Sequence, residues 1–194
     1  MTKISLLPAD TAPTLTDYVP TVDVETGTTK KATINSIKTV IAPSQLRRVH
    51  MFLNADNTGG AVMTQLEAND LSFSGTPTNY GRLNCIVPMD YVAGTTATIK
   101  LVMYGASANN QTINYYVGAH TTGSTFTSWN LQNNQTTAAA IGLTANTIGT
   151  FSLYTIAAAN LAAGAAISVA FRPSSAVTGT LVVTHAYLEY TASV

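Results

Sequence analysis

The chain has 194 residues, of which 46% are apolar and only 9% are charged, with a formal net charge of zero. This length fits one ordinary domain plus an appendage, and the balanced charge excludes the basic surplus of a protein that binds nucleic acid or an anionic membrane. Ordinary soluble domains are about 25% charged, and a nearly neutral surface is prone to association, so we expect copies of this chain or partner subunits to cover much of it.

The charges are distributed unevenly along the chain. Beyond Leu101 the only charged side chains are Arg172 and Glu189. Six of the 9 basic residues lie in the first quarter, namely Lys3, Lys30, Lys31, Lys38, Arg47 and Arg48. We predict two parts that differ in composition, an N-terminal attachment arm at residues 1–43 and a folded domain at residues 44–194.

The first part of the arm is predicted to be extended. Pro8, Pro13 and Pro20 forbid a continuous helix and favour extended backbone in the residues before them. Residues 25–29 are typical of a turn, and they separate two short extended pieces at 18–24 and 30–33. The arm lacks the large side chains that would give it a core of its own.

One short helix is expected at the end of the arm. Thr33 is a suitable N-cap, and Ile34, Ile37 and Ile41 follow at helical spacing before Pro43 ends the helix. A helix this short is marginal in water when isolated. We therefore expect its apolar stripe to need a partner surface.

The remainder of the chain predicts an all-β fold. Alternation is clearest at residues 97–104, where Ile99, Leu101 and Met103 face one side, and we expect residues 113–117 to pair with this strand. One helical turn is predicted within residues 157–164. Many short strands between Gly, Asn and Thr turns indicate an antiparallel β-sandwich of jelly-roll type. The other expected strands are 49–53, 71–73, 82–89, 125–131, 149–156, 166–172 and 180–190.

Cysteine usage and apolar stretches bear on where the chain is made. Cys85 is the only cysteine, which excludes an intrachain disulfide, and we expect it to be a small apolar filler in a strand.

No signal-peptide pattern is visible at the N-terminus. The longest apolar stretch, residues 157–171, falls short of the ~20 residues that span a bilayer. We expect synthesis in the cytosol and no membrane insertion.

The sequence gives little support for catalysis. The acidic residues Asp56, Glu67, Asp70 and Asp90 are spread over turns and short strands, where a glycosidase would need two carboxylates facing each other across a cleft. No phosphate-binding loop, dinucleotide-binding fingerprint or nucleophile elbow occurs. We predict a protein that is not an enzyme and uses no cofactor.

The three histidines give little support for a metal site. A three-histidine metal site built from His50, His120 and His185 is geometrically possible. The three residues fall on separate predicted strands or strand ends, however, and none of the close spacings typical of metal ligands is present. We predict no bound metal.

The order of several motifs resembles bacteriophage virion appendage proteins. The arm carries KISLLP at residues 3–8, DYVP at 17–20 and GTTKKAT at 27–33, followed by the apolar helix. This series is similar to the N-terminal attachment segment of phage head-fibre and tail-fibre proteins. VPMDYVAG at 87–94, IKLVMY at 99–104, GAAISVAFR at 164–172 and LVVTHAYLEY at 181–190 resemble strands of a phage jelly-roll domain.

This resemblance implies a structural, trimeric head-fibre or capsid-decoration protein. The chain would be synthesised in the cytoplasm of the bacterial host and would end on the virion surface. Its partners would be two further copies of itself and the major capsid or tail proteins. The residues expected to anchor the arm to the particle are Ile4, Leu6, Leu7, Pro8, Tyr18, Val19, Pro20, Ile34, Ile37 and Ile41.

An alternative function is suggested by the aromatic and amide residues between positions 115 and 134. Aromatic rings stack on sugars and amides form hydrogen bonds with sugar hydroxyls, so the chain could be a tail-fibre module that recognises a glycan on the host surface. The same residues would otherwise fill the core and solvate neutral loops. The candidate ligand-binding residues are Tyr116, His120, Trp129 and Asn130.

Overall fold

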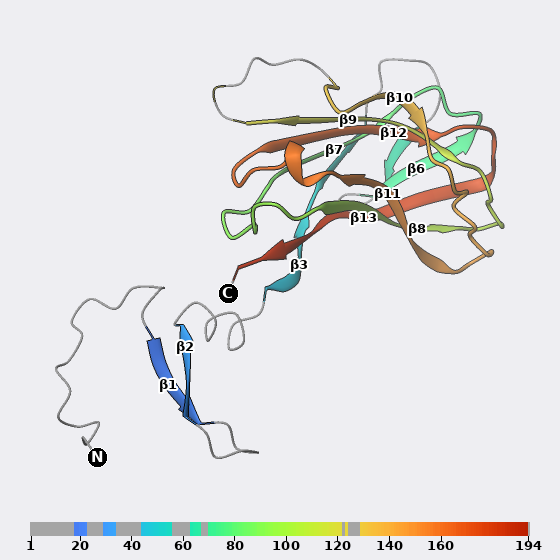
Figure 1. The fold of residues 1–194 in the computed structure, drawn as a ribbon. Helices are drawn as coiled ribbons and strands as arrows, with labels where there is room; N and C mark the ends of the chain where they lie inside the picture. Colours follow the sequence, from blue (N-terminus) through green and yellow to red (C-terminus); the bar gives the residue numbers. More distant parts are fainter. Residues whose placement is uncertain are drawn as a thin grey trace. The chain divides into compact units, whose positions relative to one another are not determined.

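The structure is a computed structural model that describes residues 18–22, 29–33, 44–55, 63–66, 70–121, 123 and 129–193 (Figure 1). For residues 18–22, 29–33 and 63–66 only the backbone is described. The chain divides into two compact units, residues 1–44 with Val194 and residues 45–193. The proposed role of residues 1–43 as an attachment arm stays a prediction.

The first unit contains a β-hairpin. Strand β1 (Tyr18–Val22) pairs antiparallel with β2 (Thr29–Thr33), from the Tyr18–Thr33 pair to the Val22–Thr29 pair. Pro20 is accommodated within β1 because proline is tolerated in strands that have an unpaired side. Of the predicted anchoring residues, Tyr18, Val19 and Pro20 lie in β1. The others, together with the predicted helix, lie outside the described residues: Ile4, Leu6, Leu7, Pro8, Ile34, Ile37 and Ile41.

The second unit is an antiparallel β-sandwich of jelly-roll type, which confirms the predicted fold class (Figure 1). One layer, named the β12 sheet here, has the order β10-β9-β12-β7-β4. Its strands are β10 (Gln132–Thr136), β9 (Ile113–His120), β12 (Ala166–Pro173), β7 (Gly81–Ile86) and β4 (Phe52–Ala55).

The other layer, named the β13 sheet, has the order β11-β8-β13-β6-β5, with β3 also paired to β13. Its strands are β11 (Ile148–Ile156), β8 (Ala97–Gly105), β13 (Val177–Ala192), β6 (Asp70–Gly75), β5 (Met63–Leu66) and β3 (Gln45–His50). The chain passes from this sheet to the β12 sheet between β3 and β4, at the buried Met51.

The core lies between the two sheets. Strand β8 alternates as predicted, with Ile99, Leu101 and Met103 fully buried. Phe73 from β6 meets Phe171 from β12 edge to face, with ring centroids 5.7 Å apart. Burying side chains of this size contributes about 1.5–3 kcal/mol each. The apolar contact across the layers therefore holds the sandwich together.

Cys85 is part of this core. Burial raises the pKa of its thiol to about 12, so the thiol stays protonated at neutral pH. This position fits the expectation of a small apolar filler.

The pairing predicted for residues 113–117 is wrong. Strand β8 is flanked by β11 and β13, whereas β9 pairs with β10 and β12 in the opposite sheet. The segment between Gly105 and Ile113 crosses from one layer to the other instead of closing a hairpin. Alternation along a strand shows which side chains face inward, but it does not show which sheet the strand joins.

The strand expected at residues 125–131 lies only partly within the described residues. Residues 124–128 lie outside the described residues, and Trp129 to Leu131 form a turn before β10 begins at Gln132. The helical turn expected within 157–164 is present as a single 3-10 turn, Ala158–Asn160. Among the described residues no helix is long and apolar enough to cross a membrane.

Strand β13 changes its inward-facing residues partway along its length. Leu181 and Val183 are buried before a register shift between Val183 and His185, and Ala186 and Leu188 are buried after it. The shift inserts Thr184 as an extra residue, and such a β-bulge re-aims the side chains that follow. His185, Tyr187 and Glu189 consequently face outward.

Candidate functional site

The outer face of the β12 sheet carries a row of small uncharged residues at its centre. Asn84 on β7 pairs with Ser168 on β12, which pairs in turn with Gly118 on β9. Asn84 is exposed and Ser168 is half-buried, because both face away from the core. The absence of a side chain at Gly118 leaves space above this row.

Three aromatic side chains gather beside the row and are named the aromatic strip here. The ring centroids of Tyr80 and Tyr116 are 5.4 Å apart, and those of Tyr116 and Trp129 are 5.5 Å apart. Arg172 lies over the Tyr80 ring at 4.5 Å and Arg82 over the Trp129 ring at 5.3 Å. These cation–π contacts cover one face of each terminal ring.

The Tyr80 hydroxyl is held within the strip. Burial, and then a hydrogen bond with Tyr116, raise the pKa of Tyr80 above its ordinary value, although Arg172 opposes the shift. Tyr80 therefore carries a neutral hydroxyl at physiological pH. It can donate or accept a hydrogen bond at the margin of the site.

Trp129, at one end of the aromatic strip, lines a hollow of about 450 Å³. Its walls combine the indole of Trp129 with amide, hydroxyl, imidazole and guanidinium groups, and its floor is the sheet itself. None of the described residues that line it is a carboxylate. The lining residues are Asn54, Arg82, Asn84, Gly118, His120, Trp129, Ser168 and Val169.

Trp129 is held in an uncommon backbone conformation. Its φ is +57°, which is unusual for a bulky residue and persists only when the surroundings impose it. The neighbouring Asn130 amide accepts from the Ala119 N–H at 2.9 Å and donates to the Ala119 carbonyl at 2.8 Å. These two bonds fasten the turn that carries Trp129 to the end of β9.

Gly118 leaves room for this arrangement. A Cβ at this position would lie 3.0 Å from Nε2 of His120 and 3.4 Å from the backbone nitrogen of Trp129. The turn therefore passes close over β9 at the one point where that strand has no side chain. Asn130 and Gly118 together determine where the indole lies.

The structure brings three of the four predicted ligand-binding residues together. Tyr116 lies in the aromatic strip, whereas His120 and Trp129 line the hollow. Asn130 instead uses its amide on the backbone of Ala119, so it positions the turn. It also borders a smaller hollow of about 260 Å³ beside the 3-10 turn.

Sequence reasoning missed other residues of the same face. Tyr80, Arg82, Asn84 and Ser168 come from segments far from residues 115–134. Alternation within the predicted strands 82–89 and 166–172 could have placed three of them outward. Only the pairing of β7, β12 and β9 shows that they adjoin Trp129.

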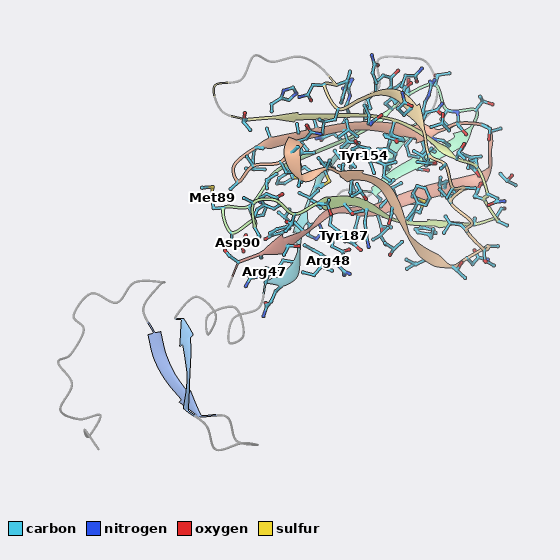
Figure 2. The ribbon with its side chains drawn as sticks, viewed as in Figure 1. Arg47, Arg48, Met89, Asp90, Tyr154 and Tyr187 are labelled. Atoms are coloured by element: carbon cyan, nitrogen blue, oxygen red, sulfur yellow. The ribbon has the colours of Figure 1, made fainter. Side chains whose placement is uncertain are left out.

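The described carboxylates lie elsewhere. Asp90 accepts from Arg47 at 2.7 Å and from the Tyr190 hydroxyl at 3.0 Å, and Figure 2 shows Arg47 and Asp90 at the same end of the sandwich. Burial, followed by this bond to Asp90, raises the pKa of Tyr190. Asp70 lies on β6. Asp56 and Glu67 lie outside the described residues.

Glu189 joins the two basic residues on the outer face of the β13 sheet. It contacts Lys100 at 2.8 Å and Arg48 at 3.0 Å. The hydrogen bond from Lys100, with a further one from Arg48, lowers the pKa of Glu189. Arg48 also lies over the Tyr187 ring at 4.8 Å, and Figure 2 shows these two side chains together.

The histidines are divided between the two faces. His120 lies on β9, whereas His50 on β3 and His185 on β13 adjoin each other, with ring centroids 5.6 Å apart. The three do not come together, and within the described part of the chain no group of three potential metal ligands is found.

No family model matches the chain, and no curated protein matches it. The solved structures that it resembles include the xylan-binding module CBM15, at 16% identity and a TM-score of 0.44, with 76% of this chain and 97% of that one covered. The CBM22-1 xylan-binding domain of Xyn10C from Paenibacillus barcinonensis has 12% identity and a TM-score of 0.41, covering 78% and 97%.

A third similar structure is the enzymatically active domain of tailspike protein 4 of bacteriophage CBA120. It has 12% identity and a TM-score of 0.32, and the match covers 76% of this chain and 19% of that one. These likenesses concern the general arrangement of strands in a sandwich.

Proposed function

We propose that this chain is a non-enzymatic glycan-binding module of a bacteriophage particle, and that the glycan binds in the hollow on the β12 sheet. The observation that carries the proposal is the position of Trp129, which borders a hollow whose other lining residues include Asn54, Asn84 and Ser168. The module would sit on the virion surface and contact the bacterial host.

The chemistry of the hollow suits a sugar. An indole face packs against the C–H groups of a pyranose ring, while amide and hydroxyl groups such as those of Asn54, Asn84 and Ser168 match its hydroxyls. The volume of about 450 Å³ falls within the roughly 300–1,000 Å³ of small-molecule sites. The hollow is therefore large enough for one or two sugar units.

The site is also prepared before the ligand arrives. Asn130 and Gly118 fix the turn that carries Trp129, and Arg82 lies over the indole ring. Groups that are already ordered lose less conformational entropy on binding. This preorganisation favours recognition of a defined sugar over loose adhesion.

The test is binding of host surface polysaccharide to the wild-type chain and to Trp129→Ala, by glycan array and calorimetry. Removing an aromatic residue central to a site typically costs about 2 kcal/mol or more, so we expect affinity to fall roughly thirtyfold or more. Tyr187→Ala, on the outer face of the other sheet, is the matched control and should bind normally. Equal loss in both variants, or no binding by the wild type, would contradict the proposal.

The non-enzymatic part of the proposal has its own measurement. The described lining of the hollow holds no carboxylate pair, which is the arrangement that glycoside hydrolysis uses. We expect prolonged incubation to leave the bound polysaccharide at its original chain length. Release of new reducing ends would show an enzyme instead.

A second candidate function is a structural one, a trimeric head-fibre or capsid-decoration protein. Two observations favour it: the hairpin of β1 and β2 belongs to a unit separate from the sandwich, and large apolar side chains are exposed at Phe52, Ile86 and Met89. Exposed apolar groups of this kind are often covered in an assembly.

Two measurements test this structural role. Removal of residues 1–43 should abolish attachment to particles that lack the protein, while the sandwich stays folded. Light scattering should report a trimer, and Phe52→Ser with Ile86→Ser should weaken it. Attachment without residues 1–43, or a wild-type monomer, would count against the structural role.

A further inference from the structure

The outer face of the β13 sheet carries a feature that glycan binding does not use. His50 on β3 and His185 on β13 lie with ring centroids 5.6 Å apart and planes inclined by 54°. Both side chains are exposed. They line a hollow of about 270 Å³, together with Arg48, Val102 and Tyr187.

A β-bulge in strand β13 places His185 on this outer face. The bulge at Thr184 reverses the alternation of β13, and without it His185 would continue the buried series of Leu181 and Val183. Thr184 donates to the carbonyl of Val102 at 3.3 Å. Bulges are over-represented at functional sites because they re-aim a side chain.

The backbone on both sides of the histidine pair is fixed. His50 pairs in register with Tyr187, and the N–H of Met51 donates to the carbonyl of Ala186 at 2.9 Å. His185 pairs with Val102 on the other side of β13. The two imidazoles therefore project from a rigid ladder, which limits the rearrangement needed to share a ligand.

We infer that His50 and His185 chelate a divalent transition-metal ion of the zinc, nickel or copper type. A zinc–nitrogen bond is about 2.0–2.1 Å long, which puts the ion roughly 3 Å from each ring centroid. Two rings that bind one tetrahedral ion then have centroids roughly 5 Å apart. The observed separation of 5.6 Å is close to this value.

The chemistry of the ligands selects the class of ion. Neutral imidazole suits zinc, copper and nickel, whereas calcium and magnesium require oxygen ligands. The remaining coordination positions face solvent and are available to water. With two protein ligands, the site has fewer than the four of a structural zinc site.

Arg48 and Tyr187 line the hollow with the histidine pair, and Arg48 is bonded through Glu189 to Lys100. Glu189 bonds both basic groups, so the three together carry one positive charge. Arg48 is also held over Tyr187. This residual charge lowers the affinity for a cation.

The test is a calorimetric titration of the tag-free full-length chain with Zn²⁺, Ni²⁺, Cu²⁺ and, separately, Ca²⁺. We expect one ion per chain, copper bound more tightly than zinc, and no heat from calcium. Because a ligating imidazole must be neutral, acid should release the ion. Absence of zinc, nickel and copper binding would overturn the inference.

Single-residue variants show which histidines bind the ion. Loss of an outer-shell partner already costs roughly 10–100-fold in metal affinity, so His50→Ala and His185→Ala should each weaken zinc binding at least tenfold. His120→Ala, which removes the remaining histidine, should leave zinc affinity unchanged. Zinc should also shift the imidazole NMR signals of His50 and His185 in the wild type. Unchanged affinity in both single variants would overturn the inference even if zinc bound elsewhere.

Discussion

The two outer faces of the sandwich share one architecture but differ in chemistry. The β12 sheet presents an aromatic strip, and Trp129 of this strip lines a hollow together with amide and hydroxyl side chains. The β13 sheet presents Arg48, Lys100 and Glu189 in a bonded group beside two histidines. The same layered scaffold therefore supports a hollow suited to a neutral ligand on one side and a charged, metal-competent surface on the other.

This difference does not arise from the strands as such. Strands in both sheets bury alternate side chains in a shared core, and the outward positions are free to vary. A turn that carries Trp129 past Gly118 makes the hollow, and a bulge at Thr184 makes the histidine pair. Local backbone irregularities on a regular scaffold thus determine the chemistry of each face.

The largest effect is expected from the core that both faces share. Phe171→Ala removes a fully buried ring that packs on Phe73, which should lower the free energy of unfolding by about 3–5 kcal/mol. Denaturant unfolding measures it. Phe52→Ala, at a side chain that is 75% exposed, should change stability by no more than about 0.5 kcal/mol. Equal effects would mean that the two sheets do not depend on this core.

A smaller effect, confined to the β12 face, is expected from Asn130→Ala. The change leaves the N–H and the carbonyl of Ala119 without the Asn130 amide, which should cost about 1–3 kcal/mol. It should also free the turn and weaken glycan binding. Trp129 is the only tryptophan, so its fluorescence reports the turn directly.

Asn133→Ala is the matched control for this change, because Asn133 is exposed on β10 in the same region. Its emission and stability should match the wild type. Unchanged Trp129 emission in Asn130→Ala would mean that the amide does not hold the turn.

Lowering the pH should reduce the stability of the protein through Glu189, on the outer face of the β13 sheet. The pKa of Glu189 is lowered by its hydrogen bond from Lys100 and by Arg48, so its contribution to stability is present above the ordinary carboxylate pKa and is lost as pH falls through the lowered value. Part of this group is exposed, which limits the gain to about 1 kcal/mol. An ordinary carboxyl group has a pKa of about 4, so the loss should occur between about pH 5 and about pH 2. In Glu189→Gln this loss of stability should be smaller. An identical pH profile would contradict this role.

The smallest effect is expected in the reactivity of the Cys85 thiol, which lies in the core between the two sheets. Burial raises the pKa of Cys85 to about 12, so an alkylating reagent should react with the native chain far more slowly than with the unfolded chain. The outward variants His185→Ala and Trp129→Ala should keep this protection. Rapid alkylation of either native variant would show that its effect extends beyond its own face.

Much of the fold could be predicted from the sequence. Alternation at residues 97–104 identified the buried side of β8, and the turns between short strands indicated a jelly-roll sandwich. The aromatic and amide content of residues 115–134 indicated a candidate site, in which Tyr116, His120 and Trp129 do lie on one face. The pairing of 113–117 with β8 was wrong because periodicity carries no information about partners.

What the sequence determined by itself is the local pattern: which side chains alternate, where glycine and proline end a strand, and how little charge is available. Only the tertiary structure decided that Arg82, Ser168 and Trp129 border one hollow, and that the bulge at Thr184 turns His185 toward His50. The physical reason is that strands distant in the sequence become neighbours through backbone hydrogen bonds. Every residue can form these bonds, so the side chains alone do not specify which strands pair.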